Sequence, residues 1–378
     1  MQVEVVRLGP AEQRLREEVR AFLGEALPPD HPPGLGMMSG RSRDFSRELA
    51  DRGWVGMAIP VEYGGHGRSA VERFVVLEEL LVVGAPVQHH WTADRQIAPS
   101  LLAFGTEEQK RWFLPRIARG ELSFALGLSE PDAGSDLASV KTTARRVEDG
   151  WVLNGSKIWT SGAREADYIV VLCRTEPRGE DRHRGLSQLI VPLGSSGVTI
   201  RPIVTLDGAA RFNEVVFQDA HVAGDHVLGN PGEGWKQITA ELGHERAGPD
   251  RILSSFQLLN ELIRHLALGR GLDALDEHVV GQLLARLWGI RQMSLAVAHA
   301  IDTGSAIGAI AAMVKDLGTS LEQATVEAIA RLAPRDLSPQ VAELLDLAVL
   351  TAPTYTLRGG TTEILRTVTA RALEGVPR

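Results

Sequence analysis

The sequence predicts a mainly α-helical protein with a central β domain. Apolar residues recur at helical spacing in the first third of the chain, alternate with a period of two in the middle, and return to helical spacing from about Gly234 onward. The chain has 378 residues, which exceeds the size at which one hydrophobic core keeps growing. We therefore expect three domains, at residues 1–120, 121–230 and 231–378.

The first domain is predicted to be entirely helical. Residues 11–27 place apolar side chains on one face of a helix, and Pro28 ends it because proline cannot continue the hydrogen-bond pattern. Two capping boxes, each a Ser or Thr followed three residues later by Glu or Gln, begin further helices at Ser69 and Thr106. These signals indicate an all-α domain over residues 1–120.

The middle domain is predicted to be a small β-barrel or sandwich. Short apolar runs separated by turn residues occur at 122–128, 144–147, 151–153, 168–173, 186–192, 198–204 and 212–217. The pair Asp149-Gly150 is a strong hairpin signal between the second and third runs. Residues 174–184 mix charges of both signs with proline and glycine, which indicates an exposed hairpin tip.

The last domain is predicted to be a helical bundle. Helical spacing covers the segments 234–268, 275–302, 306–333, 338–350 and 361–374. Pro249 lies inside the first segment, four residues after Glu245. An interior proline removes a backbone donor and crowds the preceding turn, so we expect either a kink near Glu245 or a junction between two helices.

Composition excludes several classes of function. A formal net charge of -8 argues against a general binder of nucleic acid or of anionic membranes. No run of about 18 apolar residues predicts a membrane span, and the polar N-terminus does not resemble a signal peptide. The single cysteine, Cys173, lies in an apolar run and is expected to be an inert core thiol, which fits a reducing, cytoplasmic location.

Metal and nicotinamide sites are not expected either. His66, His89 and His90 lack the accompanying ligand spacing of a metal site, so we interpret them as helix-end or loop histidines. No G-x-G-x-x-G motif follows a predicted strand, which argues against a dinucleotide site of the nicotinamide type.

One loop between predicted strands has the composition of a binding loop. Residues 127–136 read GLSEPDAGSD. Glycine permits close backbone approach, proline fixes a turn, and the hydroxyls of Ser129 and Ser135 can bond a polar ligand. Taken alone, such a run is more often a solvated turn.

Three further stretches complete a recognisable set. They are WVGMAIPVEYGG at 54–65, NGSKIWTSG at 154–162 and RGGTTEILR at 358–366. Together with the loop at 127–136, and in this order and spacing, they resemble the acyl-CoA dehydrogenase family over nearly the whole chain. The resemblance implies bound FAD and the α,β-dehydrogenation of a CoA thioester. A carboxylate removes the α-proton in that reaction, while a hydride passes from the β-carbon to flavin N5.

The resemblance also implies which residues contact the cofactor. They are Leu128, Ser129, Trp159, Ser161, Thr361 and Glu363. Trp159 would lie against the isoalloxazine ring, with the Ser161 hydroxyl near N5. Thr361 and Glu363 begin the final helix, whose N-terminus favours the pyrophosphate. Ser135 matches a serine near the CoA pantetheine. Without the resemblance, Trp159 would be a hairpin core residue and Ser135 and Ser161 turn formers.

The predicted base is Glu245. Medium-chain members of the family carry a glutamate at the position of Gly359, and glycine cannot accept a proton. The isovaleryl-type and long-chain branches instead place a glutamate in a Glu-Arg pair on the first C-terminal helix, and this chain has Glu245-Arg246 there. Arg246 would then orient the site and favour negative charge. The alternative for Glu245 is a solvated helix charge with a neighbouring partner.

Gly359 has two implied consequences. Its N-H is retained, so it can donate to the thioester carbonyl together with a flavin ribityl hydroxyl. Its missing side chain leaves space, from which we expect a bulky or branched acyl group, such as a steroid side-chain or polycyclic thioester.

The resemblance implies an electron-transfer flavoprotein as acceptor and a homodimer or tetramer. Two departures leave alternatives open: the Arg-x-x-Phe-Gly segment that many relatives use to reach a neighbour's FAD is absent, and LTAP at 350–353 replaces an Arg-Asp-Ala run. One alternative is a non-catalytic or half-site subunit in a heterotetramer with a related chain. Another is a flavin oxidase or monooxygenase on the same fold.

Overall fold

The computed structural model describes residues 5–268, 273–305, 307–333 and 337–374, apart from the side chains of 243–245. These residues divide into two compact units. The helical unit comprises Met1–Phe45, Arg68–Gln88 and Gly243–Arg378, and the sheet unit comprises Ser46–Gly67 and His89–Leu242.

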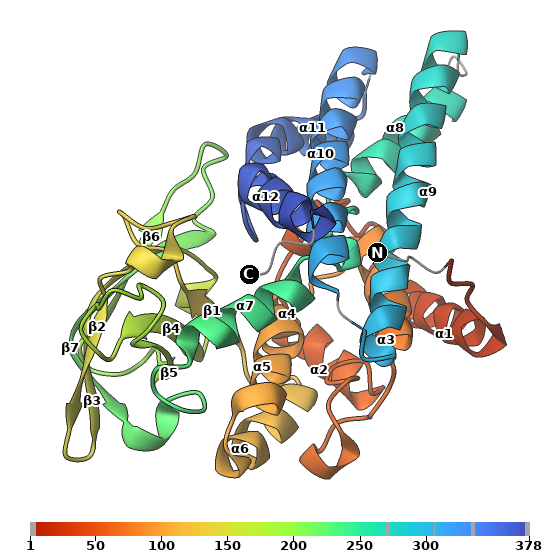
Figure 1. Ribbon diagram of the computed structural model, residues 1–378. Helices are drawn as coiled ribbons and strands as arrows, with labels where there is room; N and C mark the ends of the chain where they lie inside the picture. Colours follow the sequence, from red (N-terminus) through yellow and green to blue (C-terminus); the bar gives the residue numbers. More distant parts are fainter. Residues whose placement is uncertain (1–4, 269–272, 306, 334–336, 375–378) are drawn as a thin grey trace. The chain divides into compact units, whose positions relative to one another are not determined.

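The sheet unit is built around a curled sheet that has seven strands in the described part of the chain (Figure 1). The strands are β1 (Phe124–Gly127), β2 (Thr143–Val147), β3 (Gly150–Ser161), β4 (Tyr168–Arg174), β5 (Leu186–Pro192), β6 (Val198–Ile203) and β7 (Phe212–Ala223). Their order is β1-β4-β2-β3-β7-β6, and β5 pairs with β4. The predicted hairpin at Asp149-Gly150 is confirmed, because β2 and β3 are antiparallel and Val147 pairs with Gly150.

Short helices cover one face of this sheet. They are α5 (Ala98–Phe104) and α6 (Glu107–Ala118), together with the π-helical turn at Ala93–Ile97 that follows the short helix α4 (Gln88–Thr92). Phe113 and Ile117 of α6 pack against Phe124 of β1 and Val170 of β4. The capping box at Thr106 is confirmed by hydrogen bonds in both directions with Gln109. Burial of this apolar face holds the helices on the sheet.

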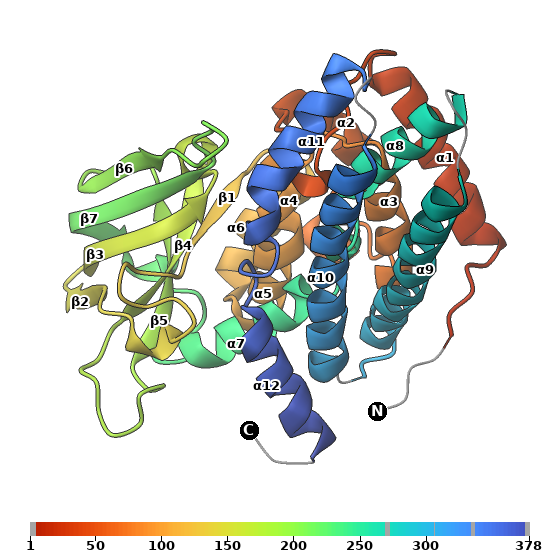
Figure 2. The same ribbon diagram turned by 90° about the horizontal axis from the view of Figure 1, so that it is seen from above.

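The helical unit is organised around α10 (Gly308–Leu332), which contacts four other helices of the unit. These are α8 (Phe256–Leu268), α9 (Ala274–Asp302), α11 (Pro339–Thr351) and α12 (Thr362–Leu373). Figure 2 shows α9 and α10 side by side. The capping box at Ser69 is confirmed at the start of α3 (Ala70–Val82), which packs against α1 (Pro10–Ala26) and α9. The remaining helix, α2, covers Arg43–Asp51.

The helical segment predicted at 234–268 is formed by two helices. The first, α7 (Gly234–Glu245), ends four residues before Pro249, and α8 begins at Phe256. Pro249 starts a short 3₁₀ helix between them, where its missing N-H costs no helical hydrogen bond. The junction that proline allowed as an alternative is therefore present. The mainly α fold with a central β domain is confirmed.

Two further expectations from the sequence concern the cysteine Cys173 and membrane-spanning helices. Cys173 is fully buried, and burial raises the pKa of its thiol to about 12, so the expected inert core thiol is confirmed. None of the described helices combines the length and apolar character needed to cross a bilayer.

The adjacent histidines His89 and His90, interpreted from the sequence as helix-end or loop residues, are buried in the short helix α4. His89 Nε2 lies 3.2 Å from Gly120 O, and His90 Nδ1 lies 2.8 Å from Ser46 Oγ. Burial lowers the pKa of His90 to about 4 from an ordinary value of 6.5. The folded protein therefore holds this imidazole neutral.

Because of His90, the free energy of unfolding should decrease as the pH is lowered. Since its pKa is lower in the folded state, the unfolded chain binds a proton first as the pH drops below 6.5, and the loss continues to about pH 4. We expect this group alone to lower the free energy of unfolding by about 2 kcal/mol between pH 7 and pH 5. Urea unfolding of the wild type and of His90→Gln at both pH values measures the difference. Equal losses in the two proteins would contradict the assignment.

Candidate active site

The loop after β1 is held to the sheet by backbone hydrogen bonds. Glu130 and Ala133 bond each other in both directions, at 2.8 and 3.1 Å, which closes a tight turn around Pro131. The carbonyl of Ser129 accepts the N-H of Ile158 at 2.9 Å. This last bond brings Leu128 and Ser129 beside the part of β3 that precedes Trp159.

A buried ion pair anchors the loop from its inner side. Lys157 of β3 is fully buried, and its Nζ donates to Glu130 Oε1 at 2.7 Å and to Leu128 O at 3.1 Å. Glu130 also accepts the N-H groups of Lys141 and Thr142, at 2.6 and 2.9 Å. Burial alone raises the pKa of Glu130, but the charge of Lys157 and these hydrogen bonds outweigh it, so the pKa lies below its ordinary value. The carboxylate is therefore charged at neutral pH.

Trp159 has an unusual backbone and an exposed ring. Its φ is +60°, in the left-handed region that bulky residues avoid, and it lies where the β3–β7 register shifts between Lys157 and Thr160. The side chain is 55% exposed and meets Phe212 only edge-on, with centroids 6.0 Å apart. Such a conformation costs about 1–3 kcal/mol and concentrates at functional sites. Trp159 is therefore not a buried core residue of the hairpin, which was the alternative to a cofactor contact.

Polar groups continue on both sides of Trp159. Asn213 Nδ2 donates to Thr160 O at 3.0 Å, which fixes the bulge from β7. Ser161, the last residue of β3, is exposed, as is Ser135 in the loop after β1. Within the sheet unit, two hydrogen bonds, from the Ile158 N-H to Ser129 O and from Lys157 Nζ to Leu128 O, therefore hold the loop next to the part of β3 that leads to Trp159.

The second group of predicted site residues lies in the helical unit. Gly359 and Gly360 both have positive φ, of +69° and +103°, and Thr361 is the N-cap of α12. Arg246, directly after α7, donates from Nε to Gly359 O at 3.0 Å. This contact joins two predicted site residues that are 113 positions apart.

Side chains that the sequence motifs did not single out hold the same loop. Lys315 of α10 donates from Nζ to Gly360 O at 2.7 Å. Arg358 donates to Ser254 Oγ at 2.8 Å and pairs with Glu322 of α10 at 3.6 Å. Glu322 in turn accepts the N-H of Ser254 at 2.7 Å, and its complete burial raises its pKa. Three consecutive residues, 358–360, are therefore each anchored.

A sequence signal for these anchors exists. Lys315 and Glu322 are ionisable residues on the face of this helical segment that carries its apolar side chains, and their separation of seven residues places them on that one face, two turns apart. Both are fully buried. Lys157 lies inside a quoted motif, but its partner Glu130 could be identified only once the register of the strands was known.

Two predicted residues need separate mention. The side chain of Glu245 lies outside the part of the chain that the structure describes, and its backbone is the last residue of α7. Glu363, in the first turn of α12, is exposed, and hydrogen bonds from its own N-H and from Thr361 lower its pKa. A carboxylate at a helix N-terminus is stabilised in this way.

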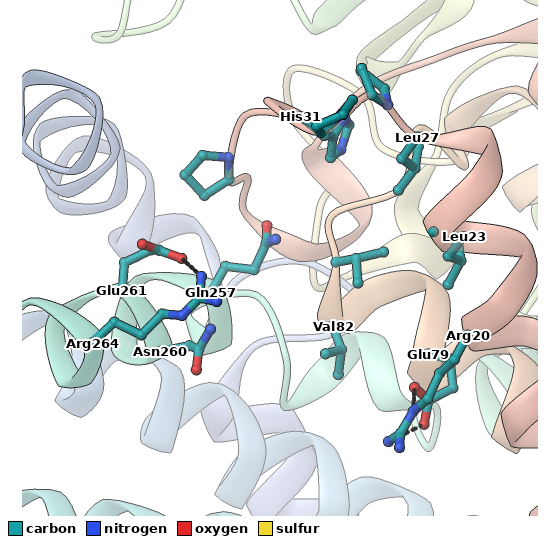
Figure 3. A pocket seen from close by; sticks show the side chains of 15 residues that line it. Arg20, Leu23, Leu27, His31, Glu79, Val82, Gln257, Asn260, Glu261 and Arg264 are labelled. Carbon is teal, nitrogen blue, oxygen red and sulfur yellow. Dashed lines mark hydrogen bonds and ion pairs between the residues drawn. The ribbon is translucent and has the colours of Figure 1, made fainter. Parts of the chain in front are cut away.

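A pocket of about 500 Å³ in the helical unit is separate from these residues (Figure 3). It lies between α1, the end of α3 and α8. Its charged side chains are paired, Arg20 with Glu79 at 2.7 Å and Arg264 with Glu261 at 3.4 Å. None of the predicted site residues lines it.

Comparison with family models matches three consecutive regions of the chain. They are the acyl-CoA dehydrogenase N-terminal domain at residues 9–121, the middle domain at 125–220 and the C-terminal domain at 232–374. Together these regions contain all of the predicted site residues.

Relatives match over nearly their full lengths. "Acyl-CoA dehydrogenase IpdE1" of Mycobacterium tuberculosis is 36% identical and covers 97% of this chain and 98% of its own. A solved structure entitled "Tcur3481-Tcur3483 steroid ACAD" has a TM-score of 0.82 at 32% identity, covering 98% of this chain and 99% of its own. The ChsE4-ChsE5 complex from Mycobacterium tuberculosis has a TM-score of 0.82 at 31% identity, with 100% of both chains covered.

Proposed function

Because the chain belongs to the acyl-CoA dehydrogenase family of flavoprotein oxidoreductases, we propose that it catalyses the FAD-dependent α,β-dehydrogenation of an acyl-CoA thioester. The hydrogen bond between Arg246 and Gly359 carries this proposal. It ties the predicted Glu-Arg base segment to the loop predicted to hold the thioester carbonyl. The reaction needs a base and a polarised carbonyl fixed in one geometry.

Each unit, taken by itself, has described residues suited to part of FAD. The exposed ring of Trp159, held in a strained conformation, offers a flat surface for an aromatic ligand beside Ser129 and Ser161. The N-terminus of α12, with Thr361 and Glu363, offers backbone N-H groups for a pyrophosphate and a carboxylate for a ribose hydroxyl. When bound, FAD supplies the acceptor of the β-hydride.

Glu245 is the proposed base for the α-proton. Its neighbour Arg246 keeps the segment next to Gly359 and adds positive charge where the enolate-like negative charge develops. The N-H of Gly359 is the proposed donor to the thioester carbonyl, and Ser135 is proposed to contact the pantetheine of the CoA substrate.

The proposed acyl group is bulky or branched. Gly359 presents no side chain at the position where medium-chain relatives carry a glutamate, and a solved relative is named a steroid enzyme in its title. A steroid-derived thioester fits both observations. We therefore place the protein in the degradation of steroid side chains or of branched fatty acids.

Partners and location follow as proposals. An electron-transfer flavoprotein is the proposed acceptor. A homodimer or tetramer is one proposed assembly, but the titles of two similar solved structures each name two chains, which favours a second candidate function: a half-site subunit that pairs with a related chain. A single buried cysteine, which cannot form an internal disulfide, fits the proposed cytoplasmic location.

The visible absorption spectrum of the chain purified without partners tests the function. We expect bound flavin that loses its colour anaerobically on addition of a steroid-derived or branched CoA ester. Bleaching by short straight-chain esters alone would contradict the proposed acyl group. A folded but colourless protein would favour the half-site subunit, and rapid oxygen consumption with peroxide would identify an oxidase or monooxygenase.

A further inference from the structure

Two cations hold two consecutive carbonyls of the Gly359-Gly360 loop. Arg246 Nε bonds Gly359 O at 3.0 Å, and Lys315 Nζ bonds Gly360 O at 2.7 Å. The two side chains come from different segments, the turn after α7 and the first third of α10. Each peptide unit of the loop is thereby fixed by its own donor.

Lys315 lies in an environment that is unfavourable for a charged side chain. Its side chain is fully buried, whereas lysine is almost never buried without a specific partner. Burying an ammonium group costs several kcal/mol unless hydrogen bonds replace its water shell. A bond to Gly360 O is therefore expected to be strongly retained in the folded state.

The same loop presents backbone donors. Among the described residues, no hydrogen bond uses the N-H of Gly359 or of Gly360. Both residues lie in the left-handed region, and a Cβ on Gly360 would come within 3.1 Å of the Arg246 guanidinium. The planar peptide unit couples the carbonyl of Gly359 to the N-H of Gly360, and the carbonyl of Gly360 to the N-H of Thr361. Arg246 therefore fixes the first of these two N-H groups and Lys315 the second, so both peptide units that flank the Gly360 Cα are held.

We propose that Lys315 is a positioning residue: by fixing the peptide unit between Gly360 and Thr361, it holds the Gly359-Gly360 segment in the conformation that presents its N-H groups to the thioester carbonyl. This inference rests on the proposed function, and it assigns to α10 a role in positioning the loop that the sequence motifs did not indicate. Glu322, two turns further along α10, holds Arg358 and Ser254 on the preceding side of the loop. One rigid helix thus fixes both ends of the donor segment, as precise binding geometry requires.

Four proteins test the inference: the wild type, Lys315→Met, Lys315→Arg and Asp316→Asn. Asp316 is the matched control, since it is the next residue on α10 and its 3.1 Å ion pair with Arg366 joins α10 to α12 without touching the loop. The first readout is hydrogen exchange of residues 355–362. We expect exchange there to rise at least tenfold in Lys315→Met, to stay low in Lys315→Arg, and to be unchanged in Asp316→Asn.

The second readout separates positioning from general structural support. The affinities of 2-octenoyl-CoA and of the thioether S-octyl-CoA, which lacks the carbonyl, are compared in each protein. We expect Lys315→Met to weaken the thioester about tenfold and the thioether less than about twofold, with Lys315→Arg recovering most of the loss. If Lys315→Met does not fold, Lys315→Gln replaces it, with the same preferential loss expected.

Equal weakening of the two ligands would overturn the inference, because it would show a structural role only. A wild type that binds the thioester no better than the thioether would overturn it too, as would unchanged exchange in Lys315→Met. Failure of the proposed function looks different: no CoA ester would reduce the flavin of the wild type, whatever the exchange measurements show.

Discussion

The variant Glu245→Gln is expected to lower the rate of flavin reduction by substrate about 10²- to 10⁴-fold while leaving FAD bound. Glutamine has nearly the same shape as glutamate but cannot accept the α-proton. The measurement is the anaerobic loss of flavin colour after rapid mixing with the CoA ester that reduces the wild type. The cofactor content of the variant is read from its spectrum before mixing.

A matched control distinguishes loss of the base from loss of a helix charge. Glu261→Gln changes a glutamate on α8 that pairs with Arg264 at 3.4 Å, and it should leave the rate unchanged. A retained rate in Glu245→Gln would contradict the assignment of the base. The carboxylate to test next would be Glu322, which is fully buried beside the Gly359-Gly360 loop and has a raised pKa.

Local signals were sufficient for most elements of the fold. The capping boxes at Ser69 and Thr106 and the Asp149-Gly150 hairpin depend on residues within three positions of each other, so tertiary contacts add little to them. The segment around Pro249 was ambiguous for the same reason. Proline excludes a straight helix locally. Whether the chain kinks or begins a new helix is decided by how α8 and the 3₁₀ helix pack on the rest of the unit. At Gly318 of α10, for example, the missing side chain lets Arg251 O of the 3₁₀ helix approach closely.

The candidate site was predictable where it depends on backbone motifs and not where it depends on pairs of distant side chains. Trp159 and Gly359 lie in short motifs whose composition is unusual. Lys315 lies on the apolar face of its helical segment, which indicates burial, but nothing near it in sequence identifies Gly360 as its partner. The partner is set by how α10 packs against the chain before α12, which is a tertiary property.

Lys157→Met should lower the free energy of unfolding by about 3–5 kcal/mol. The change leaves Glu130 charged and buried without the ammonium that faces it at 2.7 Å, and breaking a buried pair from one side costs this much. Urea unfolding at neutral pH measures the loss. Lys141→Met is the matched control, because Lys141 pairs with Asp132 of the same loop at 2.8 Å but both side chains are exposed, and little change is expected there.

The double variant Lys157→Met/Glu130→Gln decides whether the loss comes from the unpaired charge. With both charges removed, no ion is left buried, so the double variant should be destabilised by clearly less than the sum of the two single changes. An additive result would mean that the pair contributes through packing alone. Because Lys157 also bonds Leu128 O, the single variant should in addition weaken FAD binding, whereas Lys141→Met should not. A normal FAD affinity in Lys157→Met would show that the loop after β1 keeps its conformation without this anchor.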